Sequence, residues 1–175
     1  QWLSCCLLNG GLFPETHHAR LIQKMMLTPL GPLLTRLMKE KQLQRTMGKV
    51  FGPDTQPSAE LIRHFWELIS YNNGRRALNK LISYISQRVM HRERWVGALQ
   101  NSVVPLGLIN GAVDPVSGAH MVARFVEVVG EPVYRLSLPT IGHYPQVEMP
   151  VDVIAGYRAF LQQIARGSSP FCGQM

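Results

Sequence analysis

The sequence predicts an α/β fold in which parallel strands are joined by crossover helices and a long helical block is inserted between two of the strands. Three short segments look like strands: the apolar runs at residues 2–8 and 103–109, each of which ends at an Asn-Gly turn, and residues 133–138. Helical patterns follow the second and third runs. The interval between the first two runs, residues 16–100, shows helical periodicity throughout. This order of elements indicates an α/β class with crossover connections.

The first strand, residues 2–8, ends at Asn9-Gly10-Gly11, as a buried strand does where it meets a turn. In the helical block, Ser58 stands in the N-cap position of an amphipathic helix, and Asn73-Gly74 predicts that this helix ends. A further helix is expected over residues 78–89 and a short one over 95–99. Apolar residues also recur at helical spacing over residues 21–26 and 33–38.

The second half of the chain alternates strand and helix. The strand at 103–109 stops at Asn110-Gly111, residues 119–129 predict a helix, and an amphipathic helix follows Met149-Pro150. We therefore predict a core strand and turn over 1–11, a helical cap over 12–100, a further part of the core over 101–167 and a tail over 168–175. Three strands are few for an open parallel sheet, so we expect other strands, a partner or a second copy to cover it.

Composition indicates a folded globular chain, with 46% hydrophobic and 17% charged residues. Fourteen of the eighteen basic residues, but only six of the eleven acidic ones, precede residue 100. A basic surface of this kind suits phosphate or an anionic membrane. Because no nucleic-acid-binding motif accompanies it, we interpret it as a solvated helical surface and expect no nucleic-acid partner.

Cysteine and histidine spacing predicts neither a disulfide framework nor a metal site. Cys5 and Cys6 lie in an apolar run, which favours free thiols in a reducing, cytoplasmic setting. No apolar run reaches the roughly 18 residues of a membrane span, and no charged leader opens the chain. Because the first residue is Gln1 rather than Met, we expect an upstream part.

Two side chains with acid–base chemistry follow predicted strands. Asp114 comes just after the second strand, and His143 lies in the turn after the third. Ligands bind at the carboxyl ends of strands in open α/β sheets. There, the carboxylate could orient the imidazole and stabilise its charged form, so that the other ring nitrogen acts as a general base. The alternative is ordinary turn chemistry at both positions.

Several motifs resemble one branch of a known family. They are the segment Leu7 to His17 (LLNGGLFPETH), residues 51–55 (FGPDT), residues 94–99 (RWVGAL), Gly111 with Asp114-Pro115, and residues 143–148 (HYPQVE). In this order they strongly resemble the C-terminal portion of the α/β-hydrolases in the branch of the mesoderm-specific transcript protein, near epoxide hydrolases and haloalkane dehalogenases. The resemblance spans roughly residues 3–165.

The resemblance implies a cofactor-independent hydrolase with a nucleophile, a histidine and an acid. Asp114 matches the family's acid and His143 its general base. Epoxides, haloalkanes or esters of small apolar type are the implied substrates. Tyr84 and Tyr71 are candidates for polarising the substrate oxygen, and Trp66 for lining an apolar pocket, with helix packing as the alternative for all three. The nucleophile, Asp or Ser in this family, has no match in the sequence, which also lacks a Gly-x-Ser-x-Gly elbow.

Two functional readings therefore remain open. The chain is a part of a hydrolase that is inactive alone, or it is a shortened, non-catalytic relative that acts as a binding or regulatory module. The second reading requires a partner for the open sheet edge. The resemblance also leaves open whether the protein is soluble or associates with the endoplasmic reticulum, as the vertebrate relatives do.

Overall fold

The computed structural model describes residues 2–17 and 21–167, with the side chains of 21, 22 and 167 outside the description. The tail predicted over 168–175 lies outside the described residues. In chain order the elements are β1 (Cys5–Leu8), η1 (Pro14–Thr16), α1 (Leu21–Met26), α2 (Gly31–Leu37), α3 (Glu40–Met47), α4 (Ala59–Ser70), η2 (Tyr71–Ala77), α5 (Leu78–Leu81), α6 (Tyr84–Met90), α7 (Arg92–Gln100), β2 (Leu106–Gly111), α8 (Ala119–Val129), β3 (Tyr134–Leu138), α9 (Pro145–Glu148) and α10 (Pro150–Gly167).

The described strands form one parallel sheet in the order β1-β2-β3. Leu8 pairs with Ile109, and Gly111 pairs with Leu138. β2 lies in the centre and is buried at every position, whereas β1 and β3 are only partly buried. The predicted α/β fold with parallel strands and crossover helices is therefore confirmed.

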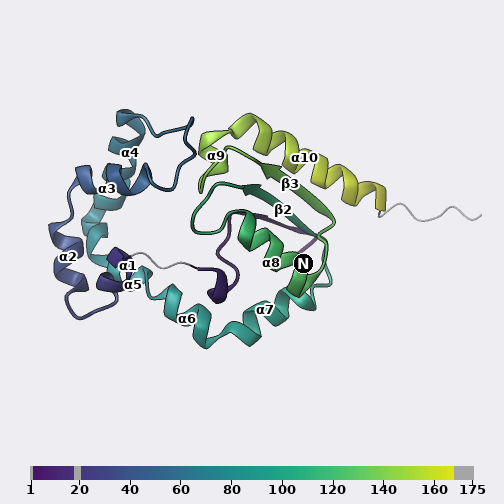
Figure 1. Cartoon of the computed structure of the whole chain (residues 1–175), viewed down its shortest axis with the longest axis horizontal. Coiled ribbons are helices and arrows are strands. Elements are labelled where there is room, and N and C mark those ends of the chain that lie inside the picture. The colour runs from purple at the N-terminus through teal and green to yellow at the C-terminus, as the bar shows by residue number, and fades with distance from the viewer. Residues whose placement is uncertain (1, 18–20, 168–175) are drawn as a thin grey trace, which may run out of the picture.

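Side chains of the central strand alternate between two hydrophobic clusters, one on each face of the sheet. Leu108 packs with Met121 and Phe125 of α8. Ile109, the next residue, packs instead with Val153 of α10. The helices α8 and α10 therefore cover opposite faces of the same sheet (Figure 1). Burial on both faces explains why the β2 sequence is a continuous apolar run rather than an alternating one.

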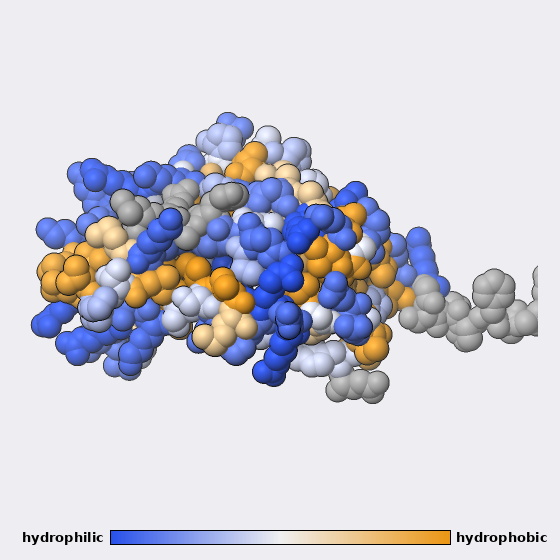
Figure 2. Space-filling model, turned by 60° about the horizontal axis from the view of Figure 1, so that its bottom comes forward, coloured by the Kyte–Doolittle hydropathy of each residue, from blue (hydrophilic) through white to orange (hydrophobic). Residues whose placement is uncertain are grey.

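The interval between β1 and β2 is helical, as predicted. Figure 1 shows α1 to α5 gathered to one side of the sheet, with α6 and α7 leading back to it. Ser58 caps α4, because its hydroxyl accepts a hydrogen bond from the Leu61 amide at 3.1 Å. α4 ends at Ser70, and Asn72 and Asn73 then adopt left-handed backbone angles. Figure 2 shows hydrophobic residues exposed at the end of the molecule that α2 forms; they are Leu30, Leu33 and Leu37.

Several predicted elements differ from the structure in their bounds, including the second strand, which spans Leu106–Gly111 rather than 103–109. The first strand begins at Cys5 rather than at residue 2, and Trp2 is 85% exposed. The hydrogen-bond ladder between β1 and β2 does not continue toward residue 2, because Pro105, which precedes β2, has no backbone N–H to donate. The Cys5 amide makes the last bond, to the Pro105 carbonyl at 3.0 Å.

The helix predicted over 78–89 is also divided, into α5 and α6. The Ser83 hydroxyl donates to the Lys80 carbonyl at 2.6 Å, a local bond that competes with continuous helix. Helix α7 begins at Arg92 and is therefore longer than the predicted segment 95–99. Among the described residues, no helix is long and apolar enough to cross a bilayer.

Candidate active site

Polar side chains from three separate segments meet at the carboxyl edge of the sheet. Asn9 follows β1, Asp114 follows β2, and His143 lies in the loop after β3. Because the strands are parallel, their carboxyl ends share one edge, and the loops that follow them are neighbours. The Asn9 side-chain amide lies 3.0 Å from the Asp114 carboxylate, which itself contacts His143. The site is therefore assembled by strand topology rather than by local sequence.

Asp114 and His143 form a hydrogen-bonded pair. Nδ1 of His143 lies 2.7 Å from Oδ2 of Asp114. The aspartate side chain has no solvent exposure, whereas the histidine side chain is 28% exposed. Because an ionised carboxylate only accepts hydrogen bonds, Nδ1 carries the proton in this pair. Nε2 then has a free lone pair, and no described residue hydrogen-bonds to it.

The Asp114 carboxylate is held from several directions. Oδ1 accepts a hydrogen bond from the Val116 amide at 2.8 Å, and Oδ2 accepts one from the Ser117 amide at 3.0 Å. The Ser117 hydroxyl lies within hydrogen-bond distance of both Oδ2 and the Asn9 carbonyl. The contacts within residues 114–117 therefore hold the carboxylate in place independently of His143.

Asn9 connects the three loops of the site. Its side-chain amide lies within hydrogen-bond distance of the Gly111 and Gly142 carbonyls as well as of Asp114, and its oxygen accepts from the Gly111 amide at 2.7 Å. Asn9 has a positive φ of 38°, a conformation that asparagine tolerates better than most residues. From the sequence, Asn9 was predicted only as a turn residue. The preference of asparagine for left-handed backbone angles, at a position next to a strand end, was the signal that could have indicated its role.

The surroundings favour the charged form of Asp114. Burial acts to raise the pKa of this carboxyl, but the hydrogen bond and charge of His143, with the Asn9 and Val116 donors, outweigh it and lower the pKa to about 2. Burial, followed by the negative charge of Asp114, raises the pKa of the neighbouring Tyr144 phenol. Tyr144 therefore remains neutral, and its ring packs edge-on against His143 with 5.0 Å between centroids.

Glu148 ties the His143 loop to the helical segment between β1 and β2. Its Oε2 accepts hydrogen bonds from the Gly52 amide at 2.7 Å, the Gly142 amide at 2.9 Å and the Thr55 hydroxyl. Its Oε1 accepts from the Tyr144 amide at 3.0 Å. Two loops that are about 90 residues apart in sequence thus share one carboxylate. Sequence reasoning quoted Glu148 only as part of a family motif and gave it no role.

Backbone and ring contacts reinforce the same junction. The His143 amide donates to the Val50 carbonyl at 2.8 Å. Phe51 and Phe65 pack on the Tyr144 ring, with centroids 5.4 Å and 6.0 Å away. A Cβ at Gly142 would lie 2.2 Å from the Val50 carbonyl oxygen, so this contact requires glycine. The helical segment therefore lies directly against the loop that carries His143.

The three predicted substrate-binding residues have different surroundings in the structure. Tyr84 begins α6 and its ring lies under the Arg88 guanidinium, 4.8 Å from the centroid. Trp66 of α4 lies under Arg75 at 5.2 Å, and Tyr71 is 80% exposed. Within the described part of the chain, none of the three is joined to His143 by a hydrogen bond or ring contact. Their roles toward substrate stay predictions.

The Asp114–His143 pair is suited to proton transfer. An imidazole oriented through Nδ1 by a buried carboxylate can take a proton at Nε2, and the carboxylate stabilises the imidazolium that forms. Among the described residues, no three His, Cys, Asp or Glu side chains are grouped as metal ligands would be. The geometry of the pair is that of a proton-transfer group.

Comparison with known proteins relates the chain to hydrolases. No family model matches it. It is 39% identical over 169 residues to the human mesoderm-specific transcript homolog protein, covering 90% of this chain and 48% of that protein. It is also 38% identical over 144 residues to the putative hydrolase LipZ of Mycobacterium tuberculosis, covering 82% and 50%. The chain thus spans about half the length of the curated relatives it matches.

Solved structures share its fold at lower identity. A membrane phospholipase A, described as a bacterial virulence factor, matches with a TM-score of 0.61 at 22% identity, over 93% of this chain and 49% of that one. A putative epoxide hydrolase from Klebsiella pneumoniae matches with a TM-score of 0.65 at 14% identity, over 93% and 58%. By sequence and by fold, the chain belongs to the α/β-hydrolase family, in the branch of the mesoderm-specific transcript proteins.

Proposed function

We propose that the chain supplies the acid and the general base of a nucleophile–histidine–acid hydrolase that acts on small apolar epoxides, haloalkanes or esters. The observation that carries this proposal is the 2.7 Å contact between Nδ1 of His143 and the buried carboxylate of Asp114. In this reaction, His143 takes a proton from water through Nε2, and the resulting hydroxide opens a covalent ester intermediate. Asp114 orients the ring and stabilises its positive charge.

The helical segment between β1 and β2 acts as the cap in this proposal. It reaches the His143 loop through the Val50 carbonyl, Phe51 and Phe65. A cap in this position would exclude water and shape the apolar part of the substrate site. Tyr84 and Tyr71 are the proposed partners of the substrate oxygen, and Trp66 is the proposed wall of the apolar site.

The nucleophile is proposed to come from outside these 175 residues, so that the chain alone does not complete covalent hydrolysis. Its lack of a Gly-x-Ser-x-Gly elbow and its coverage of about half of the relatives' length support this proposal. No cofactor is invoked, since a nucleophile, a histidine and an acid suffice for the reaction.

The experiment begins with the intact mass of the native protein. A mass well above 19.7 kDa leads to turnover assays of that longer protein with an epoxide, a haloalkane and a short ester. His143→Ala is expected to lower turnover by about 10²–10⁴-fold. His64→Ala, which removes an exposed histidine of α4, is the matched control and leaves turnover unchanged. Near-normal turnover in His143→Ala would refute the proposed role.

A non-catalytic binding or regulatory module is the second candidate. It is favoured by the exposure of Trp2 and Leu3 before β1 and of Val103 before β2, apolar side chains that a partner or a second copy would cover. A native mass close to 19.7 kDa together with no turnover would select this candidate.

A further inference from the structure

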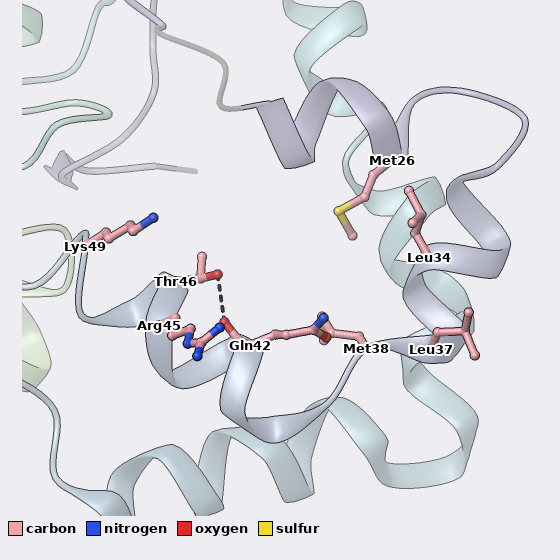
Figure 3. Close-up of a pocket in the computed structure, with 8 residues that line it drawn as sticks. All are labelled: Met26, Leu34, Leu37, Met38, Gln42, Arg45, Thr46 and Lys49. Atoms are coloured by element: carbon pink, nitrogen blue, oxygen red, sulfur yellow. Dashed lines mark hydrogen bonds between the residues drawn. The ribbon is translucent and has the colours of Figure 1, made fainter.

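A hollow lies within the helical segment, between α1, α2 and α3 (Figure 3). Its volume of about 510 Å³ falls in the range of small-molecule sites. Lining residues come from all three helices and the turns beside them: Met26, Leu34, Leu37, Met38, Gln42, Arg45, Thr46 and Lys49. None of these residues belongs to the candidate active site.

The lining is divided into an apolar end and a basic end. Leu34, Leu37 and Met38 recur at the spacing of one helical face at and just beyond α2. Arg45 of α3 and Lys49, just beyond the end of α3, are four residues apart, which is also the spacing of one helical face. Figure 3 shows the Met and Leu side chains together on one side and Arg45, Thr46 and Lys49 on the other.

Among the described residues, no acidic side chain lines the hollow, and no carboxylate forms an ion pair with Arg45. The neighbouring polar groups are already engaged: the Thr46 hydroxyl donates to the Gln42 carbonyl at 2.9 Å, and the Gln42 side-chain oxygen accepts from the Lys39 amide at 2.8 Å. An anion is the group that this end would attract.

We propose that this hollow binds a single-chain anionic amphiphile, with its alkyl tail between Met26, Leu34, Leu37 and Met38 and its carboxylate or phosphate head at Arg45 and Lys49. Methionine side chains are flexible and polarisable, so they can follow an alkyl chain of variable shape. The hollow is next to the active-site junction, because Lys49 precedes the residue whose carbonyl binds the His143 amide. The inference concerns binding only and holds whether or not the protein is a hydrolase.

The test is calorimetric titration of the full chain with dodecanoate below its micelle-forming concentration. Dodecanoate is expected to bind, whereas acetate, which lacks the tail, and dodecyltrimethylammonium, which reverses the head charge, bind at least about tenfold more weakly. Dodecyl phosphate is the second anionic probe; whichever of the two anions binds more tightly identifies the head group. Equal affinity for the anionic and cationic amphiphiles would overturn the proposal.

Matched variants locate the site. Arg45→Met is expected to weaken dodecanoate binding about tenfold, the loss typical of a hydrogen bond to a charged group. Lys41→Met removes the same charge from α3 at a position that does not line the hollow, and leaves binding unchanged. Leu37→Gln, in the lining, weakens binding, whereas Leu33→Gln, exposed elsewhere on α2, does not. Equal losses within either pair would mean a diffuse surface effect and would refute the site.

Methyl resonances provide a readout independent of affinity. With ¹³C-methyl methionine, dodecanoate is expected to shift the Met26 and Met38 signals, while Met121, buried under the sheet, stays in place. Binding without a shift of Met26 or Met38 would place the ligand elsewhere. Binding to anionic vesicles without binding of monomeric dodecanoate would also overturn the proposal, in favour of a membrane-surface role.

Discussion

Asp114 accepts hydrogen bonds on both carboxylate oxygens while its side chain is fully buried. Four of the groups that contact it are donors: the amides of Val116 and Ser117, the side-chain amide of Asn9 and the ring N–H of His143. This environment stabilises one protonation state, the carboxylate. A buried charge that is satisfied in this way is costly to neutralise, because each donor then loses part of its partner.

The pKa of Asp114 leads to a prediction about acid stability. The folded-state pKa of about 2 lies below the usual 3.8, so the stabilisation is fully present above pH 4 and is lost as pH falls toward 2. Asp114→Asn should lower the free energy of unfolding at pH 7 by on the order of 2 kcal/mol and flatten this acid limb. Urea unfolding from pH 2 to 7 measures both effects. Asp54→Asn, at an exposed position, is the control, and an equal loss there would contradict the prediction.

Glu148 allows a second prediction at the scale of one residue. In Glu148→Gln, one carboxylate oxygen becomes an NH₂ group that faces backbone N–H donors, so a cost of about 1–3 kcal/mol in the free energy of unfolding is expected. Amide hydrogen exchange should accelerate at Gly52, Gly142 and Tyr144, whose amides bind this carboxylate. Glu131→Gln, an exposed acid paired with Arg135 at 3.6 Å, should change neither quantity.

Unchanged exchange at those amides in Glu148→Gln would mean that the carboxylate does not hold the two loops together.

At the scale of elements, α6 is anchored to the end of β1 by a buried arginine. Arg88 is 5% exposed, donates to the Gly11 carbonyl and lies over the Tyr84 ring. Its Nε and Nη2 are buried and have no hydrogen-bond partner among the residues that the structure describes. Burial lowers the pKa of this guanidinium, which reflects the cost of removing its charge from water. Arg88 thus contributes packing and one contact at the cost of a desolvated charge.

Arg88→Met is therefore expected to increase the free energy of unfolding by about 1 kcal/mol or leave it unchanged, since it keeps the packed stem and removes the charge. Arg88→Ala should decrease it by about 2 kcal/mol or more, because it also removes the stem. Chemical denaturation of both variants distinguishes the two contributions. A large loss in Arg88→Met would show that the guanidinium has an anionic partner in the native protein.

At the scale of the whole molecule, the described strands leave two edge strands, β1 and β3. Both faces of β2 are covered, but the outer edge of β1 is unpaired among the described residues. Trp2 and Leu3, before β1, and Val103, before β2, are 85%, 81% and 98% exposed. A hollow beside this edge is lined partly by Trp2, Cys5 and Val103. Unpaired strand edges with exposed apolar side chains favour association.

The chain alone is therefore expected to self-associate as its concentration rises, and sedimentation velocity measures this. Leu3→Lys should reduce association, because a charge at a strand edge opposes edge-to-edge pairing. Leu68→Lys, at an exposed site on α4 away from this edge, is the control and should leave association unchanged. A chain that stays monomeric at high concentration would contradict the proposal that the edge needs a partner.

The sequence by itself determined the order of elements and the fold class. Apolar runs ending at Asn-Gly indicated the first two strands, and residues 119–129 were predicted as a helix with the bounds that α8 has. Asp114 and His143 could be selected because each follows a strand, where parallel topology places ligands. Local patterns were sufficient here since strand and helix periodicity depend on neighbouring residues only.

Tertiary structure alone decided how the site is held together. Asn9, Ser117 and Glu148 join segments that lie as many as 133 residues apart, and nothing near them in sequence reports those contacts. The same holds for the division of the helix over 78–89, the start of β1 at Cys5 opposite Pro105, and the burial of Arg88. Hydrogen bonds between distant segments depend on the packing of the whole chain, and so only the fold could reveal them.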